Sequence, residues 1–308
     1  MRALHLNTPL LRAPPELVGG RTVWLKMDAL QPGGSFKMRG VSHLVQRRVA
    51  DGARAVVCAS GGNAGMAATL AAVACGVPVT IVVPSTTGEA VRAAIAARGA
   101  RVTVHGNVWD EAHAHALAIA EQQGAAYVHP FDDPLLWHGH ATLIDEVVAD
   151  GVRFDAVFAS VGGGGLLAGI VEGLQRNGLH DVPVIAAETE GAASYAAALK
   201  AGAPVLLPAI TSIATSLGAR RVAQRVVDLA REHPIDSVVV SDAQAVRACA
   251  SLADTMRVLV EPACGAALAA LLDTGALERF DAPLVEVCGG MGVTRARLAQ
   301  WERDLGLA

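Results

Sequence analysis

The stretch Ala55-Val56-Val57-Cys58-Ala59-Ser60-Gly61-Gly62-Asn63-Ala64-Gly65 decides the fold, because it changes from strand to helix within a few residues. The apolar, mostly β-branched run at 55–58 predicts a strand that is buried on both faces. A glycine-rich turn follows, and residues 62–75 predict a helix. A buried strand that leads directly into a helix is the unit from which parallel α/β sheets are built.

The same alternation of strand and helix recurs along the chain. Strands are also predicted at 78–83, 101–104, 156–160, 183–187, 237–240 and 284–287, and helices at 89–98, 110–123, 165–177, 243–255 and 264–272. We therefore expect an α/β fold in which open, mostly parallel sheets are flanked by helices. In such folds ligands bind at the carboxyl ends of the strands.

Two proline-bearing stretches, 31–34 and 129–134, are the expected crossing points between domains. They predict a large domain formed by residues 1–31 and 135–308, with a smaller domain, 32–134, inserted into it. A chain of 308 residues, 52% of them hydrophobic, can bury a sizeable core and usually forms one large domain or two smaller ones.

Composition and charge exclude several classes of function. The net charge is −4 with no basic block, which argues against a nucleic-acid groove because such grooves need clustered Lys and Arg. The longest apolar stretch, 64–75, is too short to span a bilayer, and the N-terminus has no apolar signal core. The five cysteines and ten histidines have no metal-ligand spacing, and the cysteines indicate reduced thiols. A soluble cytoplasmic protein is expected.

Lys37 lies in the stretch Gly33-Gly34-Ser35-Phe36-Lys37-Met38-Arg39-Gly40. Ser35 is a residue type that N-caps helices, which would place Lys37 in the first helical turn. The positive end of the helix dipole lowers the pKa of a lysine there and favours the neutral amine that Schiff-base formation requires. A solvated surface lysine is the alternative.

Two glycine loops each follow a predicted strand. The turn Ser60–Gly65 would point backbone N–H groups at a carboxylate or phosphate, and Asn63 adds a side-chain donor and acceptor. The run Gly162-Gly163-Gly164-Gly165 opens a helix, and its backbone can wrap closely round a phosphate. An ordinary glycine turn is the alternative for the first loop.

The second glycine loop also supports a rival function. Gly163-x-Gly165-x-x-Ala168 satisfies the dinucleotide fingerprint, and Glu188 follows roughly 20 residues later, where an acid would hold the ribose. This pattern predicts an NAD-dependent oxidoreductase. That interpretation leaves Lys37 and the Asn63 turn without a function.

The last predicted strand ends in Cys288, which is followed by Gly289 and Gly290. A thiol at the end of a strand can exchange one hydrogen bond with a ligand. A buried structural cysteine is the alternative.

The order of these four motifs resembles the fold-type-II pyridoxal-phosphate enzymes. It is most similar to the serine/threonine dehydratases (ammonia-lyases), in particular the liver-type L-serine dehydratase branch. The resemblance runs from Thr8-Pro9-Leu10 to Cys288-Gly289-Gly290 and also rests on the stretches 24–28, 130–134 and 261–268. It implies a tryptophan synthase β-like fold with two open, mostly parallel twisted sheets.

The resemblance implies a role for each motif. Lys37 would hold the cofactor and remove the α-proton, and Phe36 would pack near the cofactor ring. The substrate carboxylate would be bound by Ser60, Gly61, Gly62, Asn63 and Ala64, with Asn63 also touching the ring hydroxyl. The cofactor phosphate would be cradled by Gly162, Gly163, Gly164 and Gly165, and Cys288 would face the pyridine nitrogen.

The resemblance also implies a monovalent cation, usually potassium, with the ligands Glu188, Ala192, Ser194, Leu217 and Ala219. Glu188 would then bind a metal rather than a ribose. A homodimer is implied, with elimination of ammonia from L-serine or L-threonine as the activity. The stretch after Cys288 leaves no room for an isoleucine-sensing domain, so we expect a catabolic enzyme without isoleucine feedback.

Gly61 departs from the pattern, because many dehydratases have Ala and serine racemases have Ser at this position. A racemase needs an acid on the second face of the α-carbon, which Gly61 cannot supply. Serine racemase is therefore the less favoured alternative. We also expect Gly61 to leave its loop looser than in alanine-bearing relatives.

Overall fold

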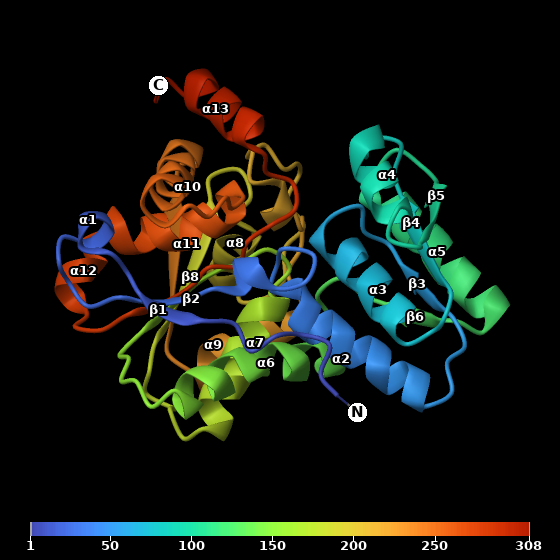
Figure 1. Cartoon of the computed structure of the whole chain (residues 1–308), viewed down its shortest axis with the longest axis horizontal. Coiled ribbons are helices and arrows are strands. Elements are labelled where there is room, and N and C mark those ends of the chain that lie inside the picture. Colours follow the sequence, from blue (N-terminus) through green and yellow to red (C-terminus); the bar gives the residue numbers. More distant parts are fainter. Residues whose placement is uncertain (1, 308) are drawn as a thin grey trace. The chain divides into compact units, whose positions relative to one another are not determined.

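The computed structural model describes residues 2–307, which form two compact units (Figure 1). One unit contains the chain up to Leu6 together with Gln31–His140, and the other contains Asn7–Leu30 and the chain from Ala141 onward. The first residues belong to the unit of Gln31 because the Gln31 amide pairs with both the N–H and the carbonyl of Leu6, at 2.8 Å each. The domain limits at 31/32 and 134/135 stay a prediction.

The smaller unit contains a four-stranded sheet in the order β5 (Arg101–Val104), β4 (Val79–Val83), β3 (Val56–Cys58) and β6 (Ala126–Val128). Every pairing in this sheet is parallel. The two central strands are the apolar ones: β3 is wholly buried, as its unbroken apolar run predicts.

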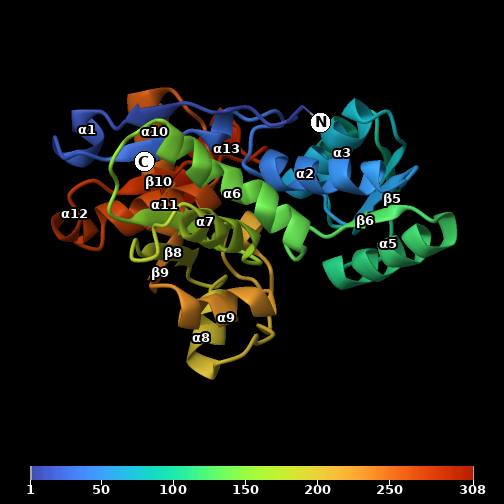
Figure 2. The ribbon, with the colours of Figure 1, turned by 90° about the horizontal axis from the view of Figure 1, so that it is seen from below.

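Four helices accompany this sheet: α2 (Lys37–Ala50), α3 (Asn63–Ala74), α4 (Glu89–Ala96) and α5 (Trp109–Gln123). Figure 2 shows α3 and α5 on opposite sides of the strands. The α5 face toward the sheet is formed by Ala112, Ala116 and Ala120, which share a core cluster with Val57 and Val82. Small residues at a spacing of four let the helix lie close to the strands.

The larger unit contains a six-stranded sheet. Its order is β1 (Leu10–Arg12), β2 (Trp24–Lys26), β10 (Leu284–Glu286), β7 (Val157–Ser160), β8 (Val184–Thr189) and β9 (Ile235–Val240). All pairings are parallel except that of β1 with β2. The two sheets confirm the predicted α/β fold with open, mostly parallel sheets.

Helices cover both faces of the larger sheet (Figure 1). The helices of this unit are α1 (Pro15–Val18), α6 (Pro134–Ala149, whose first seven residues belong to the smaller unit), α7 (Gly165–Arg176), α8 (Ser194–Ala201), α9 (Gln224–Glu232), α10 (Asp242–Met256), α11 (Pro262–Leu272), α12 (Ala276–Arg279) and α13 (Arg295–Asp304). Two 3-10 turns, η1 (Asp28–Leu30) and η2 (Thr215–Leu217), complete the unit.

Helix α11 is the central helix of the larger unit and contacts β7, β8 and α10. It is apolar around its whole circumference, and Pro262–Leu271 are all buried. Gly265 permits the close approach of α10, because a Cβ there would lie 2.6 Å from the Cys249 sulfur. The start of α11, which carries Glu261 as its N-cap, lies beside the end of β7, because the Ser160 hydroxyl donates to the Ala263 carbonyl.

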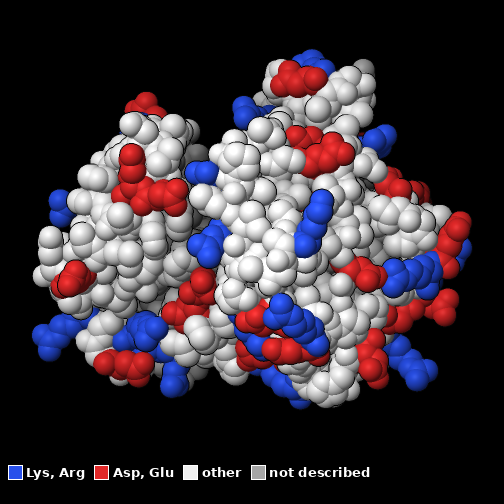
Figure 3. Space-filling view, turned by 180° about the vertical axis from the view of Figure 1, so that it is seen from behind, with Lys and Arg blue, Asp and Glu red and all other residues white. Residues whose placement is uncertain are grey.

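The outer surface carries both signs of charge. On the face drawn in Figure 3, Lys and Arg lie interspersed with Asp and Glu. Among the residues that the structure describes, no helix combines the length and apolarity needed to cross a bilayer.

Candidate active site

The chain has three lysines, Lys26, Lys37 and Lys200, and their surroundings differ sharply. Lys26 is fully buried, and its Nζ lies 2.7 Å from Glu146 and 2.6 Å from the Thr8 carbonyl. Lys200 is exposed in the last turn of α8. Lys37 is half-buried at the first position of α2. Of the three lysines, only Lys37 is both partly buried and located at a helix N-terminus.

The Lys37 amine is held by a backbone carbonyl. Its Nζ donates to the Pro130 carbonyl oxygen at 2.6 Å and lies 5.1 Å from the centre of the Phe36 ring. Pro130 follows directly after His129 in the loop that leaves β6. The sequence placed Lys37 in the first helical turn, and the structure does the same.

The expected cap of that helix is wrong. Phe36, in a helical conformation, occupies the N-cap position, and its side chain makes no capping hydrogen bond to the described residues. Ser35 contributes its backbone carbonyl instead, which accepts from the Met38 N–H at 3.2 Å. The chain enters α2 through this tight turn, so the Ser35 hydroxyl is not positioned as a cap.

The turn Ser60–Ala64 connects β3 to α3, as predicted. Gly62 is the N-cap of α3, with no side-chain cap, and Asn63 is the first helical residue. The Ser60 hydroxyl accepts from the Gly62 N–H at 3.3 Å. Residues 60–63 are all half-buried, so the first N–H groups of the helix lie near the surface of the smaller unit. This arrangement suits a bound anion.

The loop Gly162–Gly165 connects β7 to α7. Gly164 has a φ of 97°, in the region that favours glycine. A Cβ on Gly162 would lie 3.2 Å from the Cα of Leu217, and one on Gly164 would lie 2.7 Å from Val226. The loop therefore excludes side chains and presents bare backbone at a helix N-terminus, which is the arrangement that binds phosphate.

Cys288 follows β10 and is buried against Cys264 of α11. The hydrogen bond with the Cys264 side chain, together with burial, raises the pKa of the Cys288 thiol well above its usual value. The thiol is therefore protonated at neutral pH and can donate or accept a single hydrogen bond.

These strand-end loops all lie within the part of the chain that matches a known family. The family model described as pyridoxal-phosphate dependent enzyme matches residues 1–289. The chain belongs to the pyridoxal-phosphate dependent enzymes.

Relatives of this pyridoxal-phosphate dependent enzyme match along its whole length. It is 46% identical over 317 aligned residues to the Mus musculus L-serine dehydratase/L-threonine deaminase, covering 99% of this chain and 97% of the relative. A fungal L-serine ammonia-lyase from Rhizomucor miehei superposes with a TM-score of 0.91 at 34% identity, covering 99% of this chain and 100% of the other. Maize serine racemase superposes with a TM-score of 0.87 at 25% identity, covering 97% and 92%.

The buried carboxylate of Glu188 argues against the rival dinucleotide interpretation. Glu188 is fully buried at the end of β8, and its two oxygens accept from the N–H groups of Tyr195 and Ala196 at 2.7 and 2.8 Å. It therefore caps helix α8 from within the core. A carboxylate that holds a ribose has to face a ligand groove, and the family assignment removes the remaining support for NAD.

One of the other expected ligands of the monovalent cation is a buried hydroxyl group. Ser194 begins α8 and is fully buried, and within residues 2–307 its Oγ has no hydrogen-bond partner. Burial raises the pKa of nearby Glu188 from 4.5 to about 7. Leu217 and Ala219 lie in and after η2, the turn that borders Gly162. Over the described residues no cluster of three or more His, Cys, Asp or Glu side chains could hold a metal.

Glu261 is a buried acid beside the predicted loops that the sequence analysis did not single out. It is buried, and its carboxylate accepts from the Gly292 N–H at 2.6 Å and from the Ser216 hydroxyl. Glu261 thus joins the loop after Cys288 to the turn η2 that borders Gly162. The sequence shows that Glu261 directly precedes a helix. It does not show the hydrogen-bond partners of Glu261, because they are distant in sequence.

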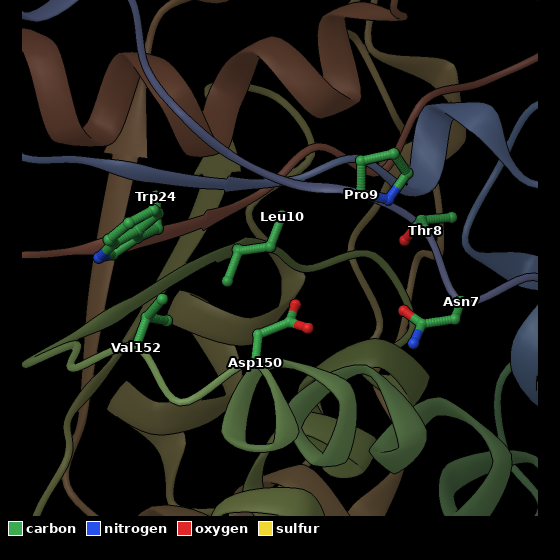
Figure 4. Close-up of a pocket in the computed structure, with 7 residues that line it drawn as sticks. All are labelled: Asn7, Thr8, Pro9, Leu10, Trp24, Asp150 and Val152. Carbon is green, nitrogen blue, oxygen red and sulfur yellow. The ribbon is translucent and has the colours of Figure 1, made fainter.

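A surface pocket of about 480 Å³ in the larger unit contains none of the predicted site residues. Figure 4 shows it lined by Asn7, Thr8, Pro9, Leu10, Trp24, Asp150 and Val152. The predicted site residues lie at strand ends and helix starts and do not line this pocket.

Proposed function

We propose that this chain is an L-serine/L-threonine ammonia-lyase that uses pyridoxal phosphate. It converts L-serine to pyruvate and ammonia, L-threonine to 2-oxobutanoate and ammonia, or both. The observation that carries the proposal is the 46% identity to the mouse L-serine dehydratase/L-threonine deaminase over 99% of this chain. The match to the fungal L-serine ammonia-lyase supports the same activity.

Lys37 is the proposed cofactor lysine and α-proton base. Lys26 is neutralised by Glu146 in the core, and Lys200 is exposed, whereas the Lys37 amine is half-buried and held by the Pro130 carbonyl. When bound, the cofactor supplies an electron sink next to the α-carbon of the substrate. The Lys37 amine removes the α-proton, and the β-hydroxyl takes up a proton and leaves as water. The aminoacrylate that is released is hydrolysed to the keto acid and ammonia, which consumes one water.

The run Gly162, Gly163, Gly164 and Gly165 is the proposed phosphate cradle. Its fit to a phosphate is supported by the space that Cβ atoms would fill at Gly162 and Gly164, and by the N-terminus of α7 that begins at Gly165. The backbone N–H groups at a helix start have no intrahelical partner and favour an anion.

The turn Ser60, Gly61, Gly62, Asn63 and Ala64 is the proposed site for the substrate carboxylate. The first N–H groups of α3 and the Ser60 hydroxyl are the donors. We assign the Asn63 amide to the cofactor ring hydroxyl and the Phe36 ring to packing near the cofactor. A carboxylate fixed in this way sets which face of the α-carbon meets the Lys37 amine.

Cys288 is the proposed partner of the pyridine nitrogen. Because its thiol stays protonated, it cannot stabilise a positive charge on that nitrogen as a carboxylate would. A weaker electron sink favours elimination of a β-substituent over transamination.

A monovalent cation, the potassium that the resemblance implies, is not needed for the assignment of activity, but the oxygen set supports one. We propose Glu188, Ala192, Ser194, Leu217 and Ala219 as its ligands. One carboxylate with neutral oxygens suits a monovalent ion. The buried Ser194 hydroxyl, which has no hydrogen-bond partner among the described residues, supports the site. We also propose a cytoplasmic homodimer, and the five free cysteines support a reducing compartment.

The test is turnover by the purified, cofactor-loaded protein. Pyruvate from L-serine and 2-oxobutanoate from L-threonine are measured by reduction with lactate dehydrogenase, and the cofactor is fixed with borohydride before peptide mapping. We expect turnover of at least one substrate, label on the Lys37 peptide, and loss of both in Lys37→Ala. The exposed Lys200→Ala is the matched control and should retain both. Racemised serine without keto-acid would instead favour the racemase alternative.

A further inference from the structure

His129 holds the loop that carries the Pro130 carbonyl. It is the residue directly after β6, and its Nδ1 accepts from the N–H of Asp132 at 2.8 Å and of Phe131 at 3.3 Å. The imidazole therefore folds back over the loop that it begins. The same loop turns the Pro130 carbonyl toward the Lys37 amine at 2.6 Å.

Two N–H donors at one ring nitrogen require that nitrogen to be unprotonated. The ring proton then lies on Nε2. Burial, followed by the charges of His113 and Lys37, lowers the pKa of His129 from 6.5 to about 4. The acceptor at Nδ1 is therefore maintained throughout the neutral pH range.

Aromatic rings fix the orientation of the imidazole. His129 makes edge contacts with Phe131 at 4.6 Å, His113 at 5.7 Å and Trp109 at 6.2 Å between ring centres. The Trp109 indole in turn donates to the Ala59 carbonyl at 2.7 Å, directly before the Ser60 turn. One ring cluster of the smaller unit thus contacts both the Lys37 loop and the proposed carboxylate turn.

The hydrogen bonds to His129 restrict the movement of the Pro130 carbonyl. Proline fixes its own φ near −65° and has no N–H that could compete for an acceptor. A primary amine that donates one N–H to a fixed oxygen loses much of its freedom to rotate about Cε–Nζ. The direction of the remaining N–H groups and of the lone pair is then set by the carbonyl.

We propose that His129 is a positioning residue for Lys37: by accepting two backbone N–H groups at Nδ1, it fixes the Pro130 carbonyl that orients the Lys37 amine. This inference rests on the proposed function of Lys37. His129 does not touch the reacting atoms and acts through the carbonyl. Misplacing a reacting group by about 1 Å can reduce a rate by about 100-fold.

Two substitutions separate the acceptor from the ring. His129→Phe keeps an aromatic ring in the cluster but removes the nitrogen, whereas His129→Asn removes the ring but keeps an oxygen that can accept the N–H two residues later. We expect His129→Phe to lower kcat by about 10- to 100-fold with little change in KM. His129→Asn should stay within about threefold of wild type, and His115→Phe, whose ring stacks on His105, is the control.

The Lys37 amine is also measured without turnover. In lysine-labelled protein lacking cofactor, the ¹³Cε signals of Lys26, Lys37 and Lys200 are recorded, with Lys37 assigned by its loss in Lys37→Ala. His129→Phe should shift the Lys37 signal and slow the attachment of added pyridoxal phosphate, while the Lys26 and Lys200 signals stay in place. His129→Asn should resemble wild type in both measurements.

Outcomes distinguish this inference from the proposed function. A folded His129→Phe with wild-type kcat and an unshifted Lys37 signal overturns the role of His129. Equal losses in the Asn and Phe variants, with equal losses in thermal stability, also overturn it, because ring packing would then be the cause. If wild type neither attaches the cofactor nor turns over, the proposed function fails, and the Lys37 signal alone still decides whether His129 orients the amine.

Discussion

Gly61 and Thr87 lie so close together that a Cβ on Gly61 would come within 2.7 Å of the Thr87 Cγ2 and 3.0 Å of its Oγ1. Val83 would be 3.2 Å away. The absence of a side chain at position 61 is therefore matched by a threonine that occupies the space. This packing argues against the expectation that Gly61 leaves a loose loop, because Thr87 already occupies the space that an alanine side chain would fill.

We predict that Gly61→Ala lowers the free energy of unfolding by about 1–3 kcal/mol, the usual effect of overpacking. The displaced turn should also raise KM for serine. Thr87→Ala in the same chain should restore most of the stability, because it removes both close atoms. Chemical denaturation of the single and double variants measures this coupling. Gly62→Ala, which meets nothing within 4 Å, is the steric control for stability.

If Gly61→Ala were as stable as wild type and bound serine equally well, the contact with Thr87 would have no energetic weight. Failure of Thr87→Ala to restore stability would point to Val83 instead.

We predict that potassium stabilises the protein more at pH 8 than at pH 5.5. Burial raises the pKa of Glu188 from 4.5 to about 7, so the folded state favours the protonated acid. Below pH 4.5 the ionisation of Glu188 does not lower the free energy of unfolding. The loss grows as the pH rises from 4.5 to 7, and above pH 7 it is about 3 kcal/mol. A cation beside the carboxylate offsets that loss only where Glu188 is ionised. Thermal unfolding in potassium chloride and in tetramethylammonium chloride at equal ionic strength measures the difference.

Glu188→Gln is the control for this effect, since it has no charge to compensate. The potassium-specific shift should disappear in this variant. A shift of equal size at both pH values, or one that persists in Glu188→Gln, would mean that the cation binds elsewhere.

Glu261→Ala is expected to weaken cofactor binding by about tenfold and to lower the free energy of unfolding by about 1–3 kcal/mol. It leaves the Gly292 N–H and the Ser216 hydroxyl without their carboxylate partner. The loop after Cys288 and the turn beside Gly162 would both loosen. Titration of the cofactor-free protein with pyridoxal phosphate measures the affinity. Ser216→Ala removes only one of the two hydrogen bonds and should have the smaller effect; the reverse order would contradict this role.

Arg257→Gly is expected to stabilise the protein by about 0.5–1 kcal/mol. Arg257 ends helix α10 with a φ of 62°, the only positive φ of a residue other than glycine within 2–307. Glycine adopts this conformation without the strain that a Cβ causes. Urea denaturation measures the change. Arg257→Ala removes the side chain but keeps the Cβ, so a gain of equal size in this variant would locate the cause in the side chain.

The parts of the structure that depend on local sequence were predictable. A buried strand, a glycine turn and a helix start lie within about ten residues, so the turns at Ser60 and Gly162 and the place of Lys37 in its helix follow from adjacent residues. The Ser35 cap was wrong for a local reason as well: several residue types can enter a helix through a tight turn, and Phe36 occupies the cap position.

Features that depend on distant residues could not be predicted in this way. The short edge strand β1 pairs antiparallel with β2, although its three residues carry no clear alternation. From the sequence, Glu261 is an ordinary acid at the start of a helix. Only the structure shows its hydrogen bonds with Gly292 and Ser216. His129 reads as a loop residue, and its partners across the ring cluster come from α5 and β6.

The discontinuous larger unit has a consequence for synthesis on the ribosome. All four strands of the smaller sheet have been made once Val128 has emerged, so that sheet can form early. Strand β2 has to wait for its neighbour β10 at Leu284–Glu286, which is made much later. Until then the apolar edge of β2 lacks its partner and is open to misassociation or to chaperones. Slowing translation between Val128 and Leu284 should therefore lower the yield of folded protein more than slowing it after Glu286.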